Sequence, residues 1–128
     1  MKALIAAVLL AVSSSAFACG VCVDDKIASC YDHAVVMSAK AKGHAVAFFA
    51  IQGELIANAE TRGAIMKAID TLPGVQRGTG RVSLENAALS FAYDPARASP
   101  ESARRELGRS LEGRRLRVAP LRTIAPGS

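Results

Sequence analysis

The sequence predicts an α+β domain: a four-stranded antiparallel sheet with two helices on one face, preceded by one additional helix. Strand-like segments, with β-forming residues and no helical period, occur near 44–51, 87–93 and 115–121. Apolar residues at helical spacing over 54–71, and a serine–proline helix start at 99–100, place a helix on either side of a glycine-rich hairpin. About 110 residues follow the N-terminal apolar stretch, which is enough for one domain.

Residues 1–18 have the features of a cleavable signal peptide. A positively charged start precedes an apolar stretch over 3–12, which is too short to span a bilayer, and Ala16 and Ala18 are the small residues that signal peptidase reads. We expect export to the periplasm, with cleavage after Ala18 and a mature chain that begins at Cys19. Lipidation of Cys19 is disfavoured because Ala16 replaces the usual Leu-like residue. No later segment is apolar enough to predict a membrane span.

A helix is predicted over Val23–Lys42, because acidic residues in its first turn suit the helix dipole and Gly43 follows its last turn. The strand predicted over His44–Ile51 is apolar on both faces. In a two-layer fold one of these faces would lack a cover. We expect the preceding helix to cover it, with Ile27, Tyr31, Ala34, Val35 and Ser38 inward, or else a partner chain, including a second copy that exchanges this helix.

The remaining elements follow in order. They are a helix over 54–71, strands over 75–84 and 87–93 joined by a turn at Glu85-Asn86, a helix from Ser99 to about Gly113, and a strand over 115–121. From His44 onward the order βαββαβ is that of the ferredoxin-like fold. We therefore divide the mature chain into an N-terminal helix over 19–43, a ferredoxin-like domain over 44–124 and a frayed tail over 125–128.

The charge is basic, with 16 Lys and Arg against 11 Asp and Glu, and eight arginines lie from Arg97 onward. Glu101, Glu106 and Glu112 are interleaved with these arginines, which is typical of a solvated helix face. Together with export, this pattern argues against a nucleic-acid partner. The sequence carries no Ser-His-Asp set, no paired carboxylates on one element and no cofactor-binding loop, so it does not predict an enzyme.

Five soft-metal donors lie together at the predicted mature N-terminus: Cys19, Cys22, Cys30, His33 and Met37. An odd number of cysteines confined to one segment does not predict a disulfide framework. On a helix, the spacings of three and four would align the last three donors on one stripe. Thiolate, thioether and imidazole ligands select Cu(I) or Zn(II) over hard cations. The pattern therefore predicts a metal site.

Two ligand sets remain open. The three cysteines with His33 would form a Cys₃His tetrahedron for Zn(II), whereas two or three thiolates near Met37 would suit Cu(I). Cys22 and Cys30 would be about 12 Å apart along a continuous helix, too far to share an ion. Either the chain folds back, or the helix starts later than Val23, or only a subset of these donors binds the metal, or a second chain completes its coordination shell.

Three segments resemble the heavy-metal-associated domains of copper chaperones, metal-pumping ATPases and periplasmic mercury-binding proteins. They are Ile51-Gln52-Gly53, Ile69-Asp70-Thr71-Leu72-Pro73-Gly74-Val75, and Phe91-Ala92-Tyr93-Asp94-Pro95-Ala96 before Ser99-Pro100-Glu101. The resemblance covers about 44–122 and implies a ferredoxin-like metal-handling domain. In that family a Cys-x-x-Cys loop after the first strand binds the metal. The corresponding segment here, 53–59, has no Cys, His or Met, so no family ligand carries over.

We therefore expect an exported soft-metal binding protein, a scavenger or chaperone for copper ahead of zinc, which passes the ion to a protein receiver or forms a homodimer. Two alternatives stay open. Cys19-Gly20-Val21-Cys22 has the spacing of a thiol–disulfide oxidoreductase, although it precedes every strand. The body could also be a non-catalytic interaction module with incidental cysteines.

Overall fold

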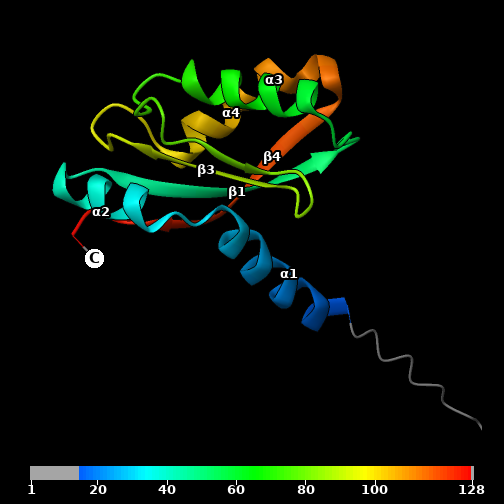
Figure 1. Ribbon diagram of the computed structural model, residues 1–128, viewed down its shortest axis with the longest axis horizontal. Helices are drawn as coiled ribbons and strands as arrows, with labels where there is room; N and C mark the ends of the chain where they lie inside the picture. The colour runs from blue at the N-terminus through cyan, green and yellow to red at the C-terminus, as the bar shows by residue number, and fades with distance from the viewer. Residues whose placement is uncertain (1–14, 128) are drawn as a thin grey trace, which may run out of the picture.

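The structure, a computed structural model, describes the backbone of residues 15–127 and the side chains of residues 23–127. It is an α+β fold in which helices cover both faces of a four-stranded antiparallel sheet (Figure 1). In chain order the elements are α1 (Ser15–Cys30), α2 (His33–Ala41), β1 (Ala45–Gly53), α3 (Ala59–Asp70), β2 (Arg81–Ser83), β3 (Ala88–Tyr93), α4 (Pro100–Leu111), the 3₁₀ turn η1 (Glu112–Arg114) and β4 (Leu116–Ile124). The predicted class and sheet type are confirmed.

The sheet has the strand order β2-β3-β1-β4, and every neighbouring pair is antiparallel. β1 lies in the interior, with Ala47 opposite Phe91 of β3 and Thr123 of β4. The register with β4 shifts between Phe48 and Phe49, close to Pro120. Proline is tolerated there because β4 is an edge strand. This order is consistent with the predicted ferredoxin-like arrangement.

The larger core lies between the sheet and the pair α3 and α4. Alternate residues of β1 face it because side chains alternate across a strand. Its aromatic centre is Phe49 stacked on Phe91, with ring centroids 5.5 Å apart. Its buried residues are Ala45, Ala47, Phe49, Ile51, Ile65, Ala68, Ile69, Leu72, Leu89, Phe91, Tyr93, Ala103, Leu107, Leu111, Leu116 and Val118.

A second core lies on the opposite face, under α1 and α2. It contains Ile27, Cys30, Val35, Val36, Ala39, Val46, Phe48, Ala88 and Ala92. The prediction that the segment before the first strand covers this face is confirmed. Two of the residues predicted to point inward, Ile27 and Val35, are buried, whereas Tyr31 and Ala34 are exposed and Ser38 is half-buried.

The prediction of one continuous helix over 23–42 is wrong. The helix ends at Cys30 and a new one begins at His33. Asp32 has extended backbone (φ −128°, ψ 112°), and its carboxylate accepts hydrogen bonds from the N–H groups of Ala34 and Val35. A capping aspartate satisfies donors at a helix start, so it favours a new helix here over continuation of the first.

Two other predicted boundaries are also wrong. α3 begins at Ala59, five residues later than predicted, because Asn58 caps it by accepting a 2.8 Å hydrogen bond from the Thr61 N–H. β2 is reduced to Arg81–Ser83, and the first part of the predicted strand is a loop in which Gly78 has positive φ. Such backbone favours glycine and interrupts a strand. The start of α4 matches the prediction, since Ser99 is its cap and Pro100 its first residue.

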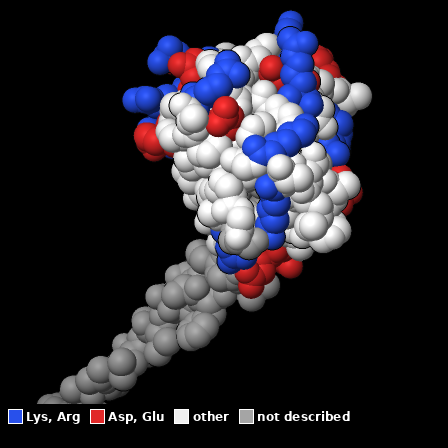
Figure 2. Space-filling model, turned by 90° about the vertical axis from the view of Figure 1, so that its left-hand side faces the viewer, with Lys and Arg blue, Asp and Glu red and all other residues white. Residues whose placement is uncertain are grey.

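At the end of the molecule that carries the α2–β1 turn, Lys and Arg side chains form a broken line with Asp and Glu beside it (Figure 2). Along α4, Arg104 pairs with Glu101, and Arg109 with Glu106. The arginines and glutamates of this helix are therefore interleaved, as predicted. Within residues 15–127, none of the helices combines the length and the apolar character that a membrane span requires.

Candidate metal centre

Cys19 and Cys22 both lie on α1. Their side chains are outside the part of the chain whose side chains are described, as are residues 1–14 of the predicted signal peptide. On the helical backbone of α1 the two residues are three positions apart, less than one turn. In Figure 1 the N-terminal part of α1 extends away from the sheet. The cysteine pair therefore belongs to a stretch of helix that projects from the body.

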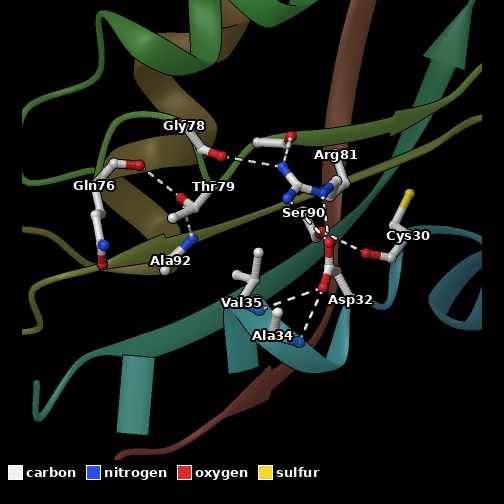
Figure 3. A network of polar contacts seen from close by, with 11 residues as sticks. Cys30, Asp32, Ala34, Val35, Gln76, Gly78, Thr79, Arg81, Ser90 and Ala92 are labelled. Atoms are coloured by element: carbon white, nitrogen blue, oxygen red, sulfur yellow. Dashed lines mark hydrogen bonds and ion pairs between the residues drawn. The ribbon is translucent and has the colours of Figure 1, made fainter. Parts of the chain in front are cut away.

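Cys30 is the last residue of α1 and belongs to the second core, with 2 % of its surface exposed. Burial raises the pKa of its thiol, and a weak hydrogen bond from Ser29 opposes this shift. Its backbone carbonyl accepts a 2.9 Å hydrogen bond from the buried Ser90 hydroxyl of β3 (Figure 3). Since α1 is continuous, about 12 Å of rise separates Cys30 from Cys22. The two thiols cannot bind the same ion while this helix is intact.

The chain between α1 and α2 is held to the sheet by Asp32. Its carboxylate caps α2 and also forms an ion pair with Arg81 of β2, whose Nε and Nη2 atoms both lie 3.0 Å from Oδ2 (Figure 3). Arg81 also donates from Nη1 to the carbonyls of Gly78 and Gly80. The hydrogen bond from Arg81 is the largest cause of the lowered pKa of the Asp32 carboxyl, and the bond from the Val35 N–H is the next.

His33 and Met37 lie on α2, and both are exposed. The Tyr31 hydroxyl lies 3.2 Å from His33 Nδ1, within hydrogen-bond distance, and the two rings are tilted with centroids 6.3 Å apart. Half of the Met37 surface is exposed. The two donors of α2 therefore face water, whereas the Cys30 thiol faces the core.

The predicted single stripe of Cys30, His33 and Met37 is wrong, because Asp32 interrupts the helix between the first and second of these donors. The five candidate ligands fall into three groups: Cys19 with Cys22 on the projecting part of α1, Cys30 in the core, and His33 with Met37 on α2. No cluster of three or more His, Cys, Asp or Glu side chains suited to a metal occurs where side chains are described.

Three residues that hold this region were not recognised from the sequence: Lys26, Arg81 and Ser90. Lys26 of α1 donates to the Asn86 and Ala87 carbonyls of the β2–β3 turn. Its partners are 60 and 61 residues away, so no local pattern indicates the contact. A signal existed only for Asp32, whose residue type is common at helix starts.

The loop after β1, where the resembled family binds metal, is closed against the start of β4. Gly53 has φ +111°, and a Cβ there would lie 2.2 Å from the Arg115 carbonyl oxygen, so only glycine fits. The side chain of Glu54 pairs with Arg115 at 3.6 Å. The other histidine is His44, at the opposite end of β1. Its Nδ1 atom lies 3.2 Å from Oε1 of Gln76. Neither position belongs to a cluster of three or more metal donors among the residues whose side chains are described.

No model of a known protein family matches this chain, and no curated protein matches it. The resemblance to heavy-metal-associated domains therefore stays a prediction from the three segments that carry it.

Proposed function

We propose that this chain is an exported soft-metal binding protein that holds one Cu(I) ion between the thiolates of Cys19 and Cys22. The body would be a ferredoxin-like scaffold of the heavy-metal-associated type, with two helices on one face and α1 and α2 added on the other. The observation that carries the proposal is the division of the cysteines: a Cys-x-x-Cys pair on the projecting part of α1, and a third cysteine buried in the core.

The separation of the donors favours Cu(I) over Zn(II). A Cys₃His zinc site would need Cys30 and His33 to join the pair, which requires opening of α1 and removal of Cys30 from the second core. Two thiolates on one helical face are a soft ligand pair for Cu(I) and need no such change. A projecting site also leaves the ion open to a receiver protein, which suits scavenging or delivery better than a structural role.

The alternatives are weaker. The interaction module was favoured by an apolar sheet face without a cover, and α1 and α2 cover that face. For the redox alternative, the Cys19-Gly20-Val21-Cys22 motif precedes every strand, whereas thioredoxin-like proteins place such a motif after a first strand within a βαβ unit. We therefore propose metal binding, with no bond chemistry, as the function.

The test is a Cu(I) titration of the purified, reduced chain against a coloured chelator. We expect about one tight equivalent, and at least a ~100-fold loss of affinity in the Cys19→Ser/Cys22→Ser variant, the upper end of what loss of an outer contact costs a metal site. The matched control is Cys30→Ser, which should keep the affinity. Equal losses in Cys30→Ser and His33→Ala, with tighter binding of Zn(II), would support the zinc set instead. No tight binding by the reduced chain would overturn the proposal.

Two simpler measurements support the same test. The mass of the purified chain should place its first residue at Cys19. Alkylation of the reduced, metal-free chain should modify two thiols quickly and one slowly, because burial shields Cys30 and raises its thiol pKa, which leaves less reactive thiolate. Addition of one Cu(I) equivalent should protect the two fast thiols. Equal rates for all three would contradict the assigned division of the cysteines.

A further inference from the structure

The outer face of α2 places two neutral soft donors side by side. His33 and Met37 are four residues apart on one helix, which brings their Cβ atoms to within about 6 Å. The opposite face of α2 is buried through Val35, Val36 and Ala39. The helix therefore cannot turn these donors inward without giving up its contacts with the sheet.

The imidazole of His33 is oriented by a neighbour. The Tyr31 hydroxyl lies 3.2 Å from its Nδ1. In the tautomer whose Nδ1–H donates to the hydroxyl oxygen, Nε2 carries the free lone pair. Histidines that bind metals usually donate the other ring N–H to a partner in this way, which sets the tautomer and the ring orientation. Tyr31 is 45 % exposed, so this contact lies at the surface beside the two donors.

We propose that His33 Nε2 and Met37 Sδ form a second soft-metal site, for Cu(I) or Ag(I), with Tyr31 as a positioning residue. An imidazole and a thioether suit these ions, whereas hard cations prefer oxygen ligands. The carboxylate of Asp32, the residue before His33, is engaged by Arg81 and by the N–H groups at the start of α2. Both ligands are uncharged, so the site should bind more weakly than a pair of thiolates.

This site goes beyond the proposed function because it uses no thiol. It lies on α2, after the helix break, whereas Cys19 and Cys22 lie on the projecting part of α1. The two sites can therefore fill independently. The α2 site would hold an ion whether or not the cysteine pair is reduced.

The test is an Ag(I) titration of the Cys19→Ser/Cys22→Ser/Cys30→Ala variant, followed by NMR of the methionine methyl groups and histidine rings. We expect the Met37 methyl and the His33 ring to shift together and to saturate near one equivalent. Met66 and His44 are internal controls: Met66 has no histidine at helical spacing on α3, and His44 Nδ1 already contacts Gln76. If Met37 and His33 stay still, or move only with the controls, the proposal is overturned.

Single substitutions sharpen this test. Met37→Leu keeps the size of the side chain and removes the sulfur, and His33→Gln removes the imidazole. Each should weaken Ag(I) binding at least ~10-fold, the lower end of the cost of disturbing a metal site. Tyr31→Phe should cause a smaller loss and change the His33 ring ¹⁵N shifts that report its tautomer. Unchanged affinity in Met37→Leu would overturn the site, and unchanged ¹⁵N shifts in Tyr31→Phe would overturn the positioning role.

The same Ag(I) titration of the reduced chain without substitutions gives a second measurement, which does not depend on whether the variant folds. The first Ag(I) equivalent should be taken by the thiols and the second should shift Met37. If the first equivalent shifts Met37 instead, the α2 site stands and the cysteine-pair proposal fails. If neither of the first two equivalents shifts Met37, the α2 site fails, whatever the thiols bind.

Discussion

The two faces of the sheet are covered in different ways. Under α3 and α4 the core contains large apolar side chains, among them Phe49, Phe91 and Leu107, each with no exposed surface. Under α1 and α2 the buried residues are mostly smaller, and polar contacts between distant segments hold the cover, as in the pair Asp32–Arg81. Both covers also make directional bonds to other segments, such as that from Arg62 of α3 to the Val82 carbonyl, but fewer large apolar side chains lie beneath the second cover.

The candidate chemistry follows this difference. All five candidate ligands lie on α1 and α2, whereas the loop after β1 carries none. A large apolar core tolerates few polar groups, because burial of an unpaired donor is costly. The smaller second cover has a projecting end and an exposed outer face, and the candidate ligands on these parts lie outside the main core.

Truncation of one buried isoleucine on each face of the sheet should give the largest effects on the free energy of unfolding. Ile69→Ala removes a fully buried side chain from the inner face of α3. It should lower the free energy of unfolding by about 4 kcal/mol, near the upper end for such changes, because the main core cannot close the cavity. Ile27→Ala, at the edge of the second core with 8 % exposure, should cost about 2 kcal/mol. Urea unfolding of both variants measures the difference. Equal costs would show that the two cores are equally close-packed.

The next effect on stability concerns the buried hydrogen bond that joins β3 of the sheet to the end of α1. Ser90→Ala leaves the Cys30 carbonyl without its donor, which should cost about 1–3 kcal/mol. The matched control is Ser110→Ala at an exposed position of α4, which should change stability little because alanine suits a helix. A cost for Ser90→Ala no larger than the control's would mean that this bond does not hold α1 to β3.

Asp32 should show a smaller, pH-dependent effect. Its pKa is lower in the folded chain because Arg81 stabilises the carboxylate, so this contribution is present above the pKa of a free aspartate, about 3.9, and is lost as the pH falls through the lower folded value. Asp32→Asn can still cap α2 but loses the ion pair.

Urea midpoints test this at two pH values. The wild-type chain should be more stable than Asp32→Asn at about pH 7 and the difference should shrink below about pH 3. Asp32→Ala, which also loses the cap, should be the least stable of the three at neutral pH. A difference that does not depend on pH would exclude the ion pair as its cause.

The smallest effect should be local. Lys26→Met keeps an apolar stem but removes the ammonium that bonds the Asn86 and Ala87 carbonyls. Amide exchange in the β2–β3 turn should become faster while the free energy of global unfolding changes little, because exposed contacts contribute mainly to local opening. Exchange that stays unchanged in the turn would show that Lys26 does not fasten it.

The fold was largely predictable because its signals are local. The continuous apolar run of β1, the alternation in β3, and the Ser99-Pro100 start of α4 each indicate an element within a few residues. The break at Asp32 was missed because the helical spacing of Cys30, His33 and Met37 continues across it, and this pattern was weighed above the capping preference of aspartate. The short β2 was missed because the residues before Arg81 form a loop in which Gly78 adopts positive φ, which the loose alternation of apolar residues over 75–84 does not indicate.

The sequence by itself determined the sheet type and most of the elements, that a cover would be needed on the second face of the sheet, and which residues are candidate ligands for a soft metal. These properties follow from the period of apolar residues and from the chemistry of side chains. Only the tertiary structure decided how the donors divide between core and surface. That division depends on bonds between residues 49 and 60 positions apart, Asp32 with Arg81 and Cys30 with Ser90, whose partners no local pattern identifies.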